Sequence, residues 1–178
     1  MNNRNPSNLL NQTLRLAGVV QESIVDGPGI RYVVFTQGCL HRCPGCHNPE
    51  SHDPMGGMER PISILLEEIK KNPLLKGVTF SGGEPFMQPM PLATLGKAIK
   101  EMGLDLIVYS GYTFEELWDM AGVQPQIMAL LSACDILIDG RFIEKQRDIE
   151  LSFRGSGNQR VIDLPASLAS GRAVETQF

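Results

Sequence analysis

Three cysteines lie in one short segment of this chain, residues 36–54, which reads TQGCLHRCPGCHNPESHDP. Cys39, Cys43 and Cys46 form the pattern C-x3-C-x2-C, and Pro44 and Gly45 interrupt any helix between the second and the third cysteine. The backbone can therefore wrap around a compact centre and direct three sulfurs inward. Soft thiolates of this kind suit zinc or an iron–sulfur cluster.

The three thiolates leave more than one kind of site open. A closed zinc site would need a histidine of the segment, or Cys134, as the fourth ligand of a tetrahedron. A four-iron cluster usually takes four cysteines, so a cluster on three leaves one iron free for a substrate or cofactor. If the segment holds iron, we expect it to do chemistry. A zinc-stabilised binding module and a plain electron carrier are the competing interpretations.

The remaining candidate ligands have ordinary explanations. We expect His41 and His52 to face solvent or to stand behind the ligands, and His47 is a possible but weaker candidate for a fourth ligand. Cys134 lies in an apolar stretch and is interpreted as a small buried side chain.

Composition limits the classes of protein that fit. The chain has 178 residues, enough for one domain with a continuous core, and a net charge of −4. No basic cluster interleaved with aromatic residues is present, which disfavours nucleic acid as a partner. No apolar run approaches the roughly 18 residues that span a bilayer. We therefore expect a cytoplasmic protein without membrane contact, whose cysteines are metal ligands before they are disulfides.

Strands and helices alternate along the sequence. Residues 31–38 are predicted to form a strand that leads into the cysteines, and residues 61–72 an amphipathic helix. The pattern then predicts a strand over 77–83, a helix from about Pro91 to Gly103, a strand over 105–111, a helix that begins at the capping box of Thr113 and Glu116, and strands over 135–139 and 159–164. Such alternation predicts parallel pairing and an α/β architecture, either an open doubly wound sheet or a partial barrel.

The chemically distinctive residues follow the ends of these strands. Cys39 follows the first strand, Gly82–Glu84 the second, Ser110 the third, and Asp139 ends the fourth. In parallel α/β folds the ligand chemistry collects at the carboxyl ends of the strands. We therefore expect four strand ends to converge on one site.

At this point a family resemblance becomes clear. The C-x3-C-x2-C pattern after the first strand resembles the cluster loop of the radical S-adenosylmethionine enzymes, and SGGEP (81–85) resembles the Gly-Gly-Glu motif of that family. The segment DGPGIRYVVFTQGC (26–39) further resembles the branch that activates glycyl radical enzymes. Within that branch, CPGCHNPE, DILIDGRF and FRGSGNQRVID are similar to the activators of anaerobic ribonucleotide reductase, and Gly45 fits these better than the activators of pyruvate formate-lyase.

The resemblance implies a fold and a division of the chain. It covers residues 14–164, which would form one radical S-adenosylmethionine domain, with a polar N-terminus at 1–13 and a tail at 165–178. A closed eight-unit barrel typically needs about 250 residues. About five βα units would therefore form a partial, open βα barrel of parallel strands, whose open side suits a protein loop as substrate.

The resemblance also implies an activity. Cys39, Cys43 and Cys46 would be the metal ligands and the catalytic centre, holding a [4Fe–4S] cluster whose fourth iron binds S-adenosylmethionine. Reductive cleavage would give a 5′-deoxyadenosyl radical, which takes hydrogen from a glycine of a partner, foremost an anaerobic ribonucleotide reductase. Another glycyl radical enzyme, or a small-molecule radical reaction, is the alternative. Electrons would come from a flavodoxin or ferredoxin.

Individual cofactor contacts follow from the same resemblance. Gly82 and Gly83 would let the backbone approach the methionine end of the cofactor, and Glu84 would pair with its ammonium group. The adjacent residues Gly45, Cys46 and His47 would contact the adenine side.

Further positions are candidates for contacts with the nucleoside of the cofactor, and some of them have a structural alternative. Asp139 ends a buried strand and needs a partner, for which the ribose hydroxyls are a candidate. Arg141 stands where the pyruvate formate-lyase activators have a lysine that contacts the nucleoside. Ser110 would contact the ribose or cap its strand, and Asn158 and Arg160 would contact the cofactor or close the last turn.

The DGPG segment is not assigned to the cofactor. It forms a tight turn in which Asp26 and Arg31 make a local ion pair, or it helps to dock the glycine loop of the partner.

Overall fold

The structure, a computed structural model, describes residues 12–178, and most of the expected polar N-terminus lies outside the described residues. A seven-stranded sheet runs through this part of the chain in the order β3-β1-β2-β4-β5-β6-β7. Its strands are β1 (Thr13–Ser23), β2 (Arg31–Thr36), β3 (Met58–Pro61), β4 (Gly77–Gly82), β5 (Asp105–Tyr109), β6 (Ile136–Asp139) and β7 (Arg160–Asp163). The helices are α2 (Ile62–Lys71), α3 (Pro89–Glu101), α4 (Phe114–Ala121), α5 (Pro125–Ala133) and α6 (Leu164–Ser170). Short 3-10 turns are η1 (Pro49–Ser51), η2 (Pro85–Met87) and η3 (Glu144–Gln146).

The centre of the sheet is parallel, as the alternating pattern predicted. Strands β2, β4, β5 and β6 pair in parallel and in sequence order. This confirms the α/β class. The sheet ends on β3 at one edge and on β7 at the other, so it is open.

The margins of the sheet differ from the prediction. Strand β1, which the sequence pattern did not reveal, pairs antiparallel with both β2 and β3. Strand β7 was expected to be parallel, and this was wrong, because it pairs antiparallel with β6. The physical reason is the connection: only the 3-10 turn η3 lies between β6 and β7, and a parallel return needs a long crossover, usually a helix.

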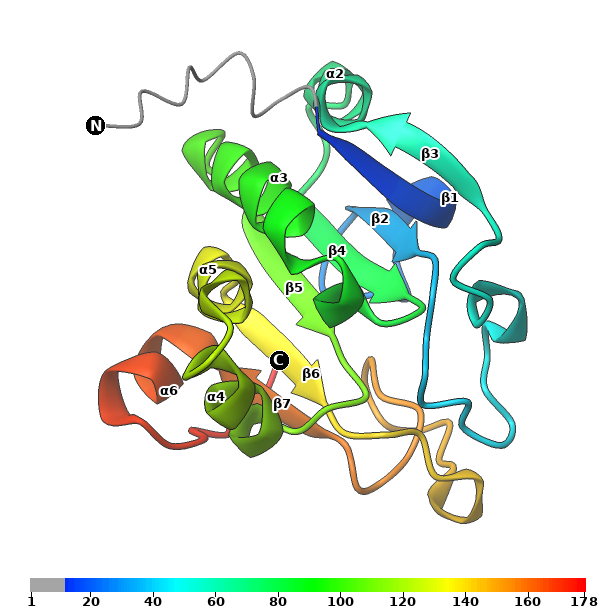
Figure 1. Cartoon of the computed structure of the whole chain (residues 1–178), viewed down its shortest axis with the longest axis vertical. Coiled ribbons are helices and arrows are strands. Elements are labelled where there is room, and N and C mark those ends of the chain that lie inside the picture. Colours follow the sequence, from blue (N-terminus) through cyan, green and yellow to red (C-terminus); the bar gives the residue numbers. More distant parts are fainter. Residues whose placement is uncertain (1–11) are drawn as a thin grey trace.

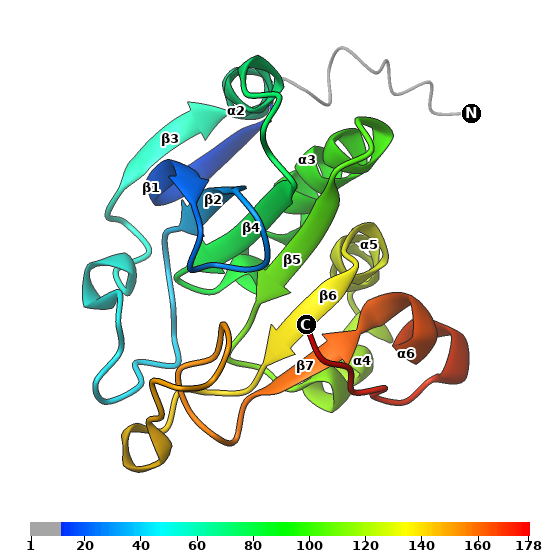
Figure 2. The ribbon, with the colours of Figure 1, turned by 180° about the vertical axis from the view of Figure 1, so that it is seen from behind.

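The helices cover one face of the sheet. Figure 1 shows α2, α3, α4 and α5 in front of the strands, and Figure 2, from behind, shows the opposite face of the central strands without a helix. Side chains at alternate positions of the central strands point to the helices and form the core, among them Val78, Phe80, Leu106, Val108 and Leu137. The predicted apolar stripe of α2, which includes Leu65, Leu66 and Ile69, is buried in the same core.

Local sequence signals fix the helix starts. The capping box predicted at Thr113 is present, with the Thr113 side chain accepting from the Glu116 amide and the Glu116 carboxylate accepting from the Thr113 amide. Helix α3 begins at Pro89, slightly before the expected Pro91, because Gln88 is its N-cap and Pro89 occupies the first helical position. No helix of residues 12–178 is long and apolar enough to cross a membrane.

Candidate functional site

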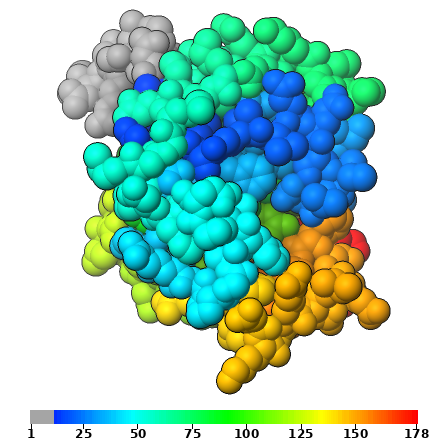
Figure 3. Space-filling model, turned by 90° about the vertical axis from the view of Figure 1, so that its right-hand side faces the viewer, coloured from blue at the N-terminus to red at the C-terminus, as the bar shows by residue number. Residues whose placement is uncertain are grey.

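A cavity of ≈ 550 Å³ opens at the carboxyl ends of β2, β4 and β5 on the face that bears no helix. Phe35, Ser81 and Tyr109, at the ends of these three strands, form part of its wall. In Figure 3 the blue 20–30 segment, the cyan cysteine segment and the orange segment near residue 150 meet on one face, with green atoms of the middle of the chain visible between them. The predicted convergence of strand ends is therefore present for these three strands.

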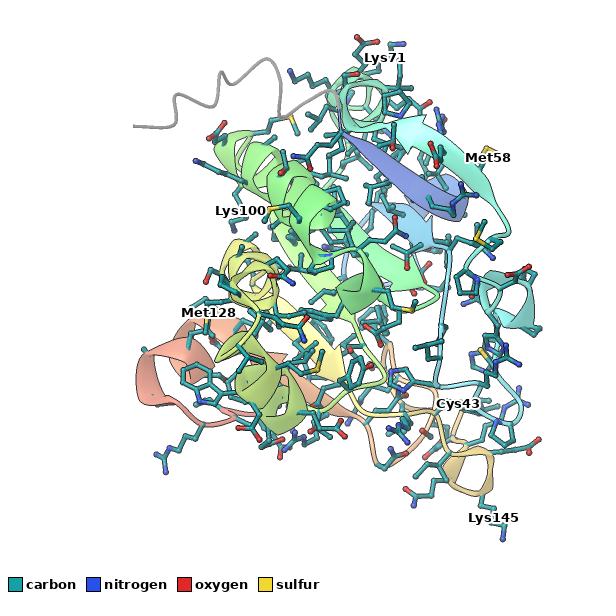
Figure 4. All side chains as sticks on the ribbon, viewed as in Figure 1. Cys43, Met58, Lys71, Lys100, Met128 and Lys145 are labelled. Carbon is teal, nitrogen blue, oxygen red and sulfur yellow. The ribbon has the colours of Figure 1, made fainter. Side chains whose placement is uncertain are left out.

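The cysteine segment is held against the sheet by backbone hydrogen bonds. The Gly38 amide donates to the Ser51 carbonyl at 2.8 Å and the Cys39 amide to the His52 carbonyl at 3.1 Å, which closes the segment into a loop. All three cysteines are free thiols and all three line the cavity. Figure 4 places Cys43 at the end of the molecule that also carries Lys145 of η3.

The donor set of the loop is suited to an iron–sulfur cluster. Within residues 12–178, no three side chains of His, Cys, Asp or Glu lie close enough together to hold a metal ion. The cavity nevertheless gathers three thiols in one wall, and soft thiolates are the ligands that such clusters take. Burial raises the pKa of the Cys39 thiol, so metal binding at this position must displace a proton.

Gly82 and Gly83 are required by the packing of two loops. Gly82 has φ of 95°, and a Cβ there would lie 2.5 Å from the Thr36 nitrogen. A Cβ on Gly83 would lie 2.4 Å from the Gly38 carbonyl oxygen. Both glycines line the cavity beside Ser81, so this part of the wall at the end of β4 has no side chain beyond Ser81.

The Glu84 carboxylate is hydrogen-bonded within the protein. Its side chain is only 1% exposed and does not line the cavity. One carboxylate oxygen accepts from the Phe86 amide at 3.0 Å, and the other accepts from the Gly111 amide at 2.9 Å. The Ser110 hydroxyl donates to the same carboxylate, and His41 Nε2 lies 3.0 Å from Oε2. Glu84 thus joins the ends of β4 and β5 to the cysteine loop.

His41 does not face solvent: it lies beside Glu84 and also forms part of the cavity wall. Its side chain is 6% exposed, paired with Glu84, and its ring lies edge-on to Tyr112 with centroids 4.4 Å apart. Cys134 is buried at the end of α5 and is not part of the cavity wall, as expected for a small core side chain. It is therefore not placed to complete a zinc tetrahedron with the loop cysteines.

Asp139 has a partner, but not the one expected. Its carboxylate accepts from the Phe114 amide at 2.7 Å and from Arg160 Nε at 3.0 Å. The residue is 1% exposed and outside the cavity wall, and the ribose contact stays a prediction. The contact with Arg160 follows from the antiparallel β6–β7 pairing, in which Asp139 stands opposite Arg160.

Three further expected contacts also lie outside the cavity wall. Asn158 closes the turn before β7, since its amide donates to the Arg141 carbonyl at 2.8 Å and its side-chain oxygen accepts from Ser156. Arg141 is exposed. Gly45, with φ of 72°, packs against Glu144 and Phe142, which a Cβ would approach to 3.1 and 3.3 Å.

The DGPG segment lacks the expected ion pair. Arg31 is fully buried. Its Nη1 lies 2.6 Å from Asp105 Oδ1, and its Nε donates to Thr79 Oγ1 at 2.7 Å. Asp26 instead accepts from the Ser23 hydroxyl at 2.5 Å and lines the cavity. The sequence alone could not separate these partners, because Asp105 and Thr79 reach Arg31 only through the pairing of the strands.

The far wall of the cavity was missed by sequence reasoning. It comes from the segment between β6 and β7 and includes Phe142, Phe153 and Arg154. The Phe142 ring lies 5.0 Å from that of His47, so the two segments meet across the cavity. The later part of this segment reads FRGSGNQ (153–159), and its density of glycine and polar residues was the available signal.

An α/β fold with a three-thiol loop at the strand ends defines the class of iron–sulfur proteins with a single cluster domain. Residues 25–162 match the family model described as "4Fe-4S single cluster domain". The chain is 35% identical over 149 residues to the anaerobic ribonucleoside-triphosphate reductase-activating protein of Vibrio cholerae serotype O1, a match that covers 76% of this chain and 89% of the relative. The corresponding protein of Escherichia coli K12 is 33% identical over 149 residues, covering 78% and 91%. The chain belongs to the family of anaerobic ribonucleoside-triphosphate reductase-activating proteins.

Two other comparisons extend the similarity, one in sequence and one in fold. The pyruvate formate-lyase-activating enzyme of Clostridium pasteurianum is 40% identical over 112 residues, covering 58% of this chain and 47% of the relative. The crystal structure of QueE from Escherichia coli shares the fold with a TM-score of 0.50 and 14% identity, over 63% of this chain and 58% of QueE. The resemblance drawn from the sequence motifs is confirmed, and the chain is an enzyme of the activating type.

Proposed function

We propose that this chain activates an anaerobic ribonucleotide reductase by forming a radical on a glycine of that enzyme. Cys39, Cys43 and Cys46 hold a [4Fe–4S] cluster, and the cavity binds S-adenosylmethionine. The observation that supports this most directly is that three free thiols share one cavity with the backbone of Gly82 and Gly83. When bound, the reduced cluster supplies the electron that splits S-adenosylmethionine into methionine and the 5′-deoxyadenosyl radical.

In this proposal the residues of the chain bind, orient and enclose S-adenosylmethionine. A volume of ≈ 550 Å³ lies within the usual range of ligand cavities, about 300–1,000 Å³. Gly82 and Gly83 offer close backbone approach to the methionine end, while His47 beside Phe142 provides ring surface for the adenine. Ser110 lines the cavity, but its hydroxyl donates to Glu84. Its main role in this proposal is therefore to hold Glu84 and not to donate a hydrogen bond to the cofactor.

Glu84 acts in this proposal as a positioning residue. Its buried carboxylate is occupied by donors from η2, from the end of β5 and from His41, so it holds the cysteine loop in place over the strand ends. The expectation that it pairs with the ammonium of the cofactor would require one of these contacts to give way.

The partner assignment rests on the relatives. Their names give an anaerobic ribonucleoside-triphosphate reductase as the enzyme that is activated. The similarity to a pyruvate formate-lyase-activating enzyme keeps another glycyl radical enzyme as the second candidate. The sheet face without a helix carries the cavity and is interpreted as the inside of a partial barrel, where a partner loop would enter. A flavodoxin or ferredoxin of the cytoplasm would supply the electron.

Reconstitution with a partner tests this function. Anaerobically loaded and reduced protein is mixed with S-adenosylmethionine and an anaerobic ribonucleotide reductase, and electron spin resonance is recorded. We expect a glycyl radical signal and 5′-deoxyadenosine. Cys43→Ala should abolish both, whereas Cys134→Ala, which removes a thiol far from the cavity, should retain both. Normal 5′-deoxyadenosine formation by the Cys43→Ala protein would contradict the proposal.

Metal analysis separates the competing classes. A zinc-stabilised binding module would contain zinc and no iron and would be colourless. A plain electron carrier would contain iron and sulfide but would leave S-adenosylmethionine intact. We expect about four irons per chain, brown absorbance and cleavage of the cofactor.

A further inference from the structure

The segment after α6 runs beside β7 and reaches the face on which the cavity opens. The Asp163 amide donates to the Val174 carbonyl and the Thr176 amide donates to the Val161 carbonyl, both at 2.9 Å, so residues 174–176 pair with this edge strand. In Figure 2 the dark red end of the chain lies in front of β6 and β7, and in Figure 1 it is fainter and lies behind them. Both views place it on the sheet face without a helix. We call residues 172–178 the edge segment.

A buried serine holds the beginning of the edge segment. Ser167 of α6 is fully buried, and its hydroxyl donates to the Asp163 carbonyl at 2.6 Å and accepts from the Val174 amide at 2.8 Å. Ala173, the neighbour of Val174, packs against the apolar core. The edge segment is therefore anchored to the fold before it reaches Phe178.

Phe178 connects the edge segment to the cavity wall. Its ring lies edge-on to that of Phe153, with centroids 5.1 Å apart and an interplanar angle of 86°, a geometry that aromatic pairs prefer. Phe153 belongs to the far wall of the cavity, in the segment between β6 and β7. Phe178 itself is 45% exposed and is not part of that wall. It therefore acts on the cavity only through Phe153.

Phe153 has a backbone conformation that needs support. Its φ of 58° lies in the left-handed region, which a bulky residue rarely adopts. Such a conformation persists only where the surrounding structure holds it. The Tyr109 hydroxyl donates to the Phe153 carbonyl at 2.8 Å, which fixes the backbone, and the Phe178 ring packs against the side chain. Two contacts from different parts of the chain thus hold one residue of the wall.

We propose that Phe178 is a positioning residue for hydrogen transfer, because by holding Phe153 it keeps the far wall of the cavity in place. This inference rests on the proposed function, in which the C5′ radical gains one hydrogen atom as the Cα–H bond of a partner glycine breaks. A wall that opens admits solvent components. The radical then takes its hydrogen atom from a C–H bond of an organic buffer molecule, which is left as the new radical, and 5′-deoxyadenosine forms without a glycyl radical.

Hydrogen exchange of the cluster-free protein tests whether Phe178 holds the wall. The Gly155 and Ser156 amides donate to Gln159 Oε1 at 2.8 and 3.2 Å, so their exchange reports opening of this segment. We expect Phe178→Ala to accelerate exchange in a peptide of residues 151–157 by about 2- to 10-fold, which corresponds to the loss of one aromatic pair. Phe178→Tyr keeps the ring and should exchange like the wild type. Unchanged exchange in Phe178→Ala overturns the proposal.

The ratio of glycyl radical to 5′-deoxyadenosine in the loaded protein with its partner tests the role in the reaction. We expect Phe178→Ala to lower this ratio by about 2- to 10-fold and Phe178→Tyr to keep it. A variant that only folds or loads less well loses both products together, so an unchanged ratio overturns the role of Phe178. Val123→Ala is the matched control and should change neither measurement, because Val123 is an 80% exposed apolar side chain outside the cavity wall.

The two measurements distinguish this inference from the proposed function. A loaded wild type that forms neither product overturns the proposed function and, with it, the role in hydrogen transfer. Normal products in the wild type with an unchanged ratio in Phe178→Ala overturn this inference alone. If Phe178→Ala does not fold, Phe178→Leu decides, because it keeps an apolar side chain and removes the ring. Faster exchange together with a lower ratio then supports the inference, and a wild-type value of either refutes it.

Discussion

Glu84 shows how one motif residue can serve the frame of a site. Its carboxylate lies among donors from the cysteine loop, from η2 and from the end of β5, and almost none of it is exposed. Because the charge is compensated inside the protein, removing it leaves several donors without their acceptor. The stability of the cysteine loop should therefore depend on this single side chain.

We expect Glu84→Gln to lower the free energy of unfolding by about 1.5–3 kcal/mol, the usual range for hydrogen bonds to a charged group. Urea denaturation of the cluster-free protein measures this. Glu59→Gln is the control, because Glu59 is 57% exposed and its ion pair with Arg15 should contribute less than about 1 kcal/mol. Equal effects of the two substitutions would contradict the positioning role.

Glu115 gives the structure a measurable pH dependence. Its hydrogen bond with Arg160 holds the pKa of the carboxyl below its usual range. A lowered pKa in the folded state stabilises the protein above the unfolded value, about 4.3, and this stabilisation is lost as pH falls through the folded pKa.

We therefore expect Glu115→Gln to cost about 0.2–1 kcal/mol at pH 7, since the side chain is 59% exposed, and the difference from wild type to be smaller at pH 3. Urea midpoints at the two pH values give the comparison. A difference that is larger in acid than at neutral pH would show that the sign is wrong.

Asp139 marks the limit of residue-level prediction. That a carboxylate at the end of a buried strand needs a partner followed from its solvation energy, and this was correct. The identity of the partner depended on the direction of β7, which places Arg160 opposite Asp139. Arg31 shows the same limit, since its partner Asp105 is brought near by strand pairing and not by nearness in sequence.

At the level of elements, the junction of β4 with the cysteine loop is a close backbone contact of the site. The Gly83 amide donates to the Thr36 carbonyl, and the Glu84 amide donates to the Gly38 carbonyl, both at 2.8 Å. A side chain at Gly83 would meet backbone and not a flexible group, so relief requires the loop to move.

We expect Gly83→Ala to destabilise the protein by about 1–3 kcal/mol, as is usual for overpacking, and to weaken cluster retention. Gly18→Ala is the matched control, because a Cβ at Gly18 has no neighbour within 4 Å. Denaturation midpoints and iron content after gel filtration provide the two measurements. Retention of both by the Gly83 variant would mean that the loop is not fixed by this contact.

The central elements could be predicted because each has a strong local signal, such as the run Tyr32–Phe35 or the apolar stripe of α2. Strand β1 was missed because its pairing with β2 shifts register between Leu16 and Gly18 and again near Ser23, which interrupts the alternation of apolar residues. The wall formed by Phe142 and Phe153 was missed because that segment has little regular structure and is placed by tertiary contacts.

At the scale of the whole molecule, the apolar core that stabilises the fold and the cavity that holds the candidate site lie on different faces of the sheet. The helices and the apolar core lie on one face of the sheet, while the cavity lies at the strand ends on the other, walled by loops from distant parts of the sequence (Figures 1 and 2). A ligand that joins these loops should therefore raise the stability of the folded state by mass action.

We expect anaerobic reconstitution with iron and sulfide to raise the thermal midpoint by about 5–10 °C when loading exceeds the dissociation constant a hundredfold. Cys43→Ala should lose this increase, and Cys134→Ala should keep it. Scanning calorimetry under argon makes the measurement. An equal rise in both variants would show that the stabilisation does not come from the three-cysteine loop.

The burial of Cys134 gives this chain an internal reference for counting occupied sites. Of its four cysteines, this one is only 3% exposed, and burial raises the pKa of its thiol, which keeps it in the unreactive protonated form. An alkylating reagent applied to the folded protein therefore modifies Cys43 and Cys46 first and Cys39 more slowly, and only where no iron protects them. The mass added before and after denaturation then reports what fraction of the molecules in a preparation carried iron on the three-cysteine loop.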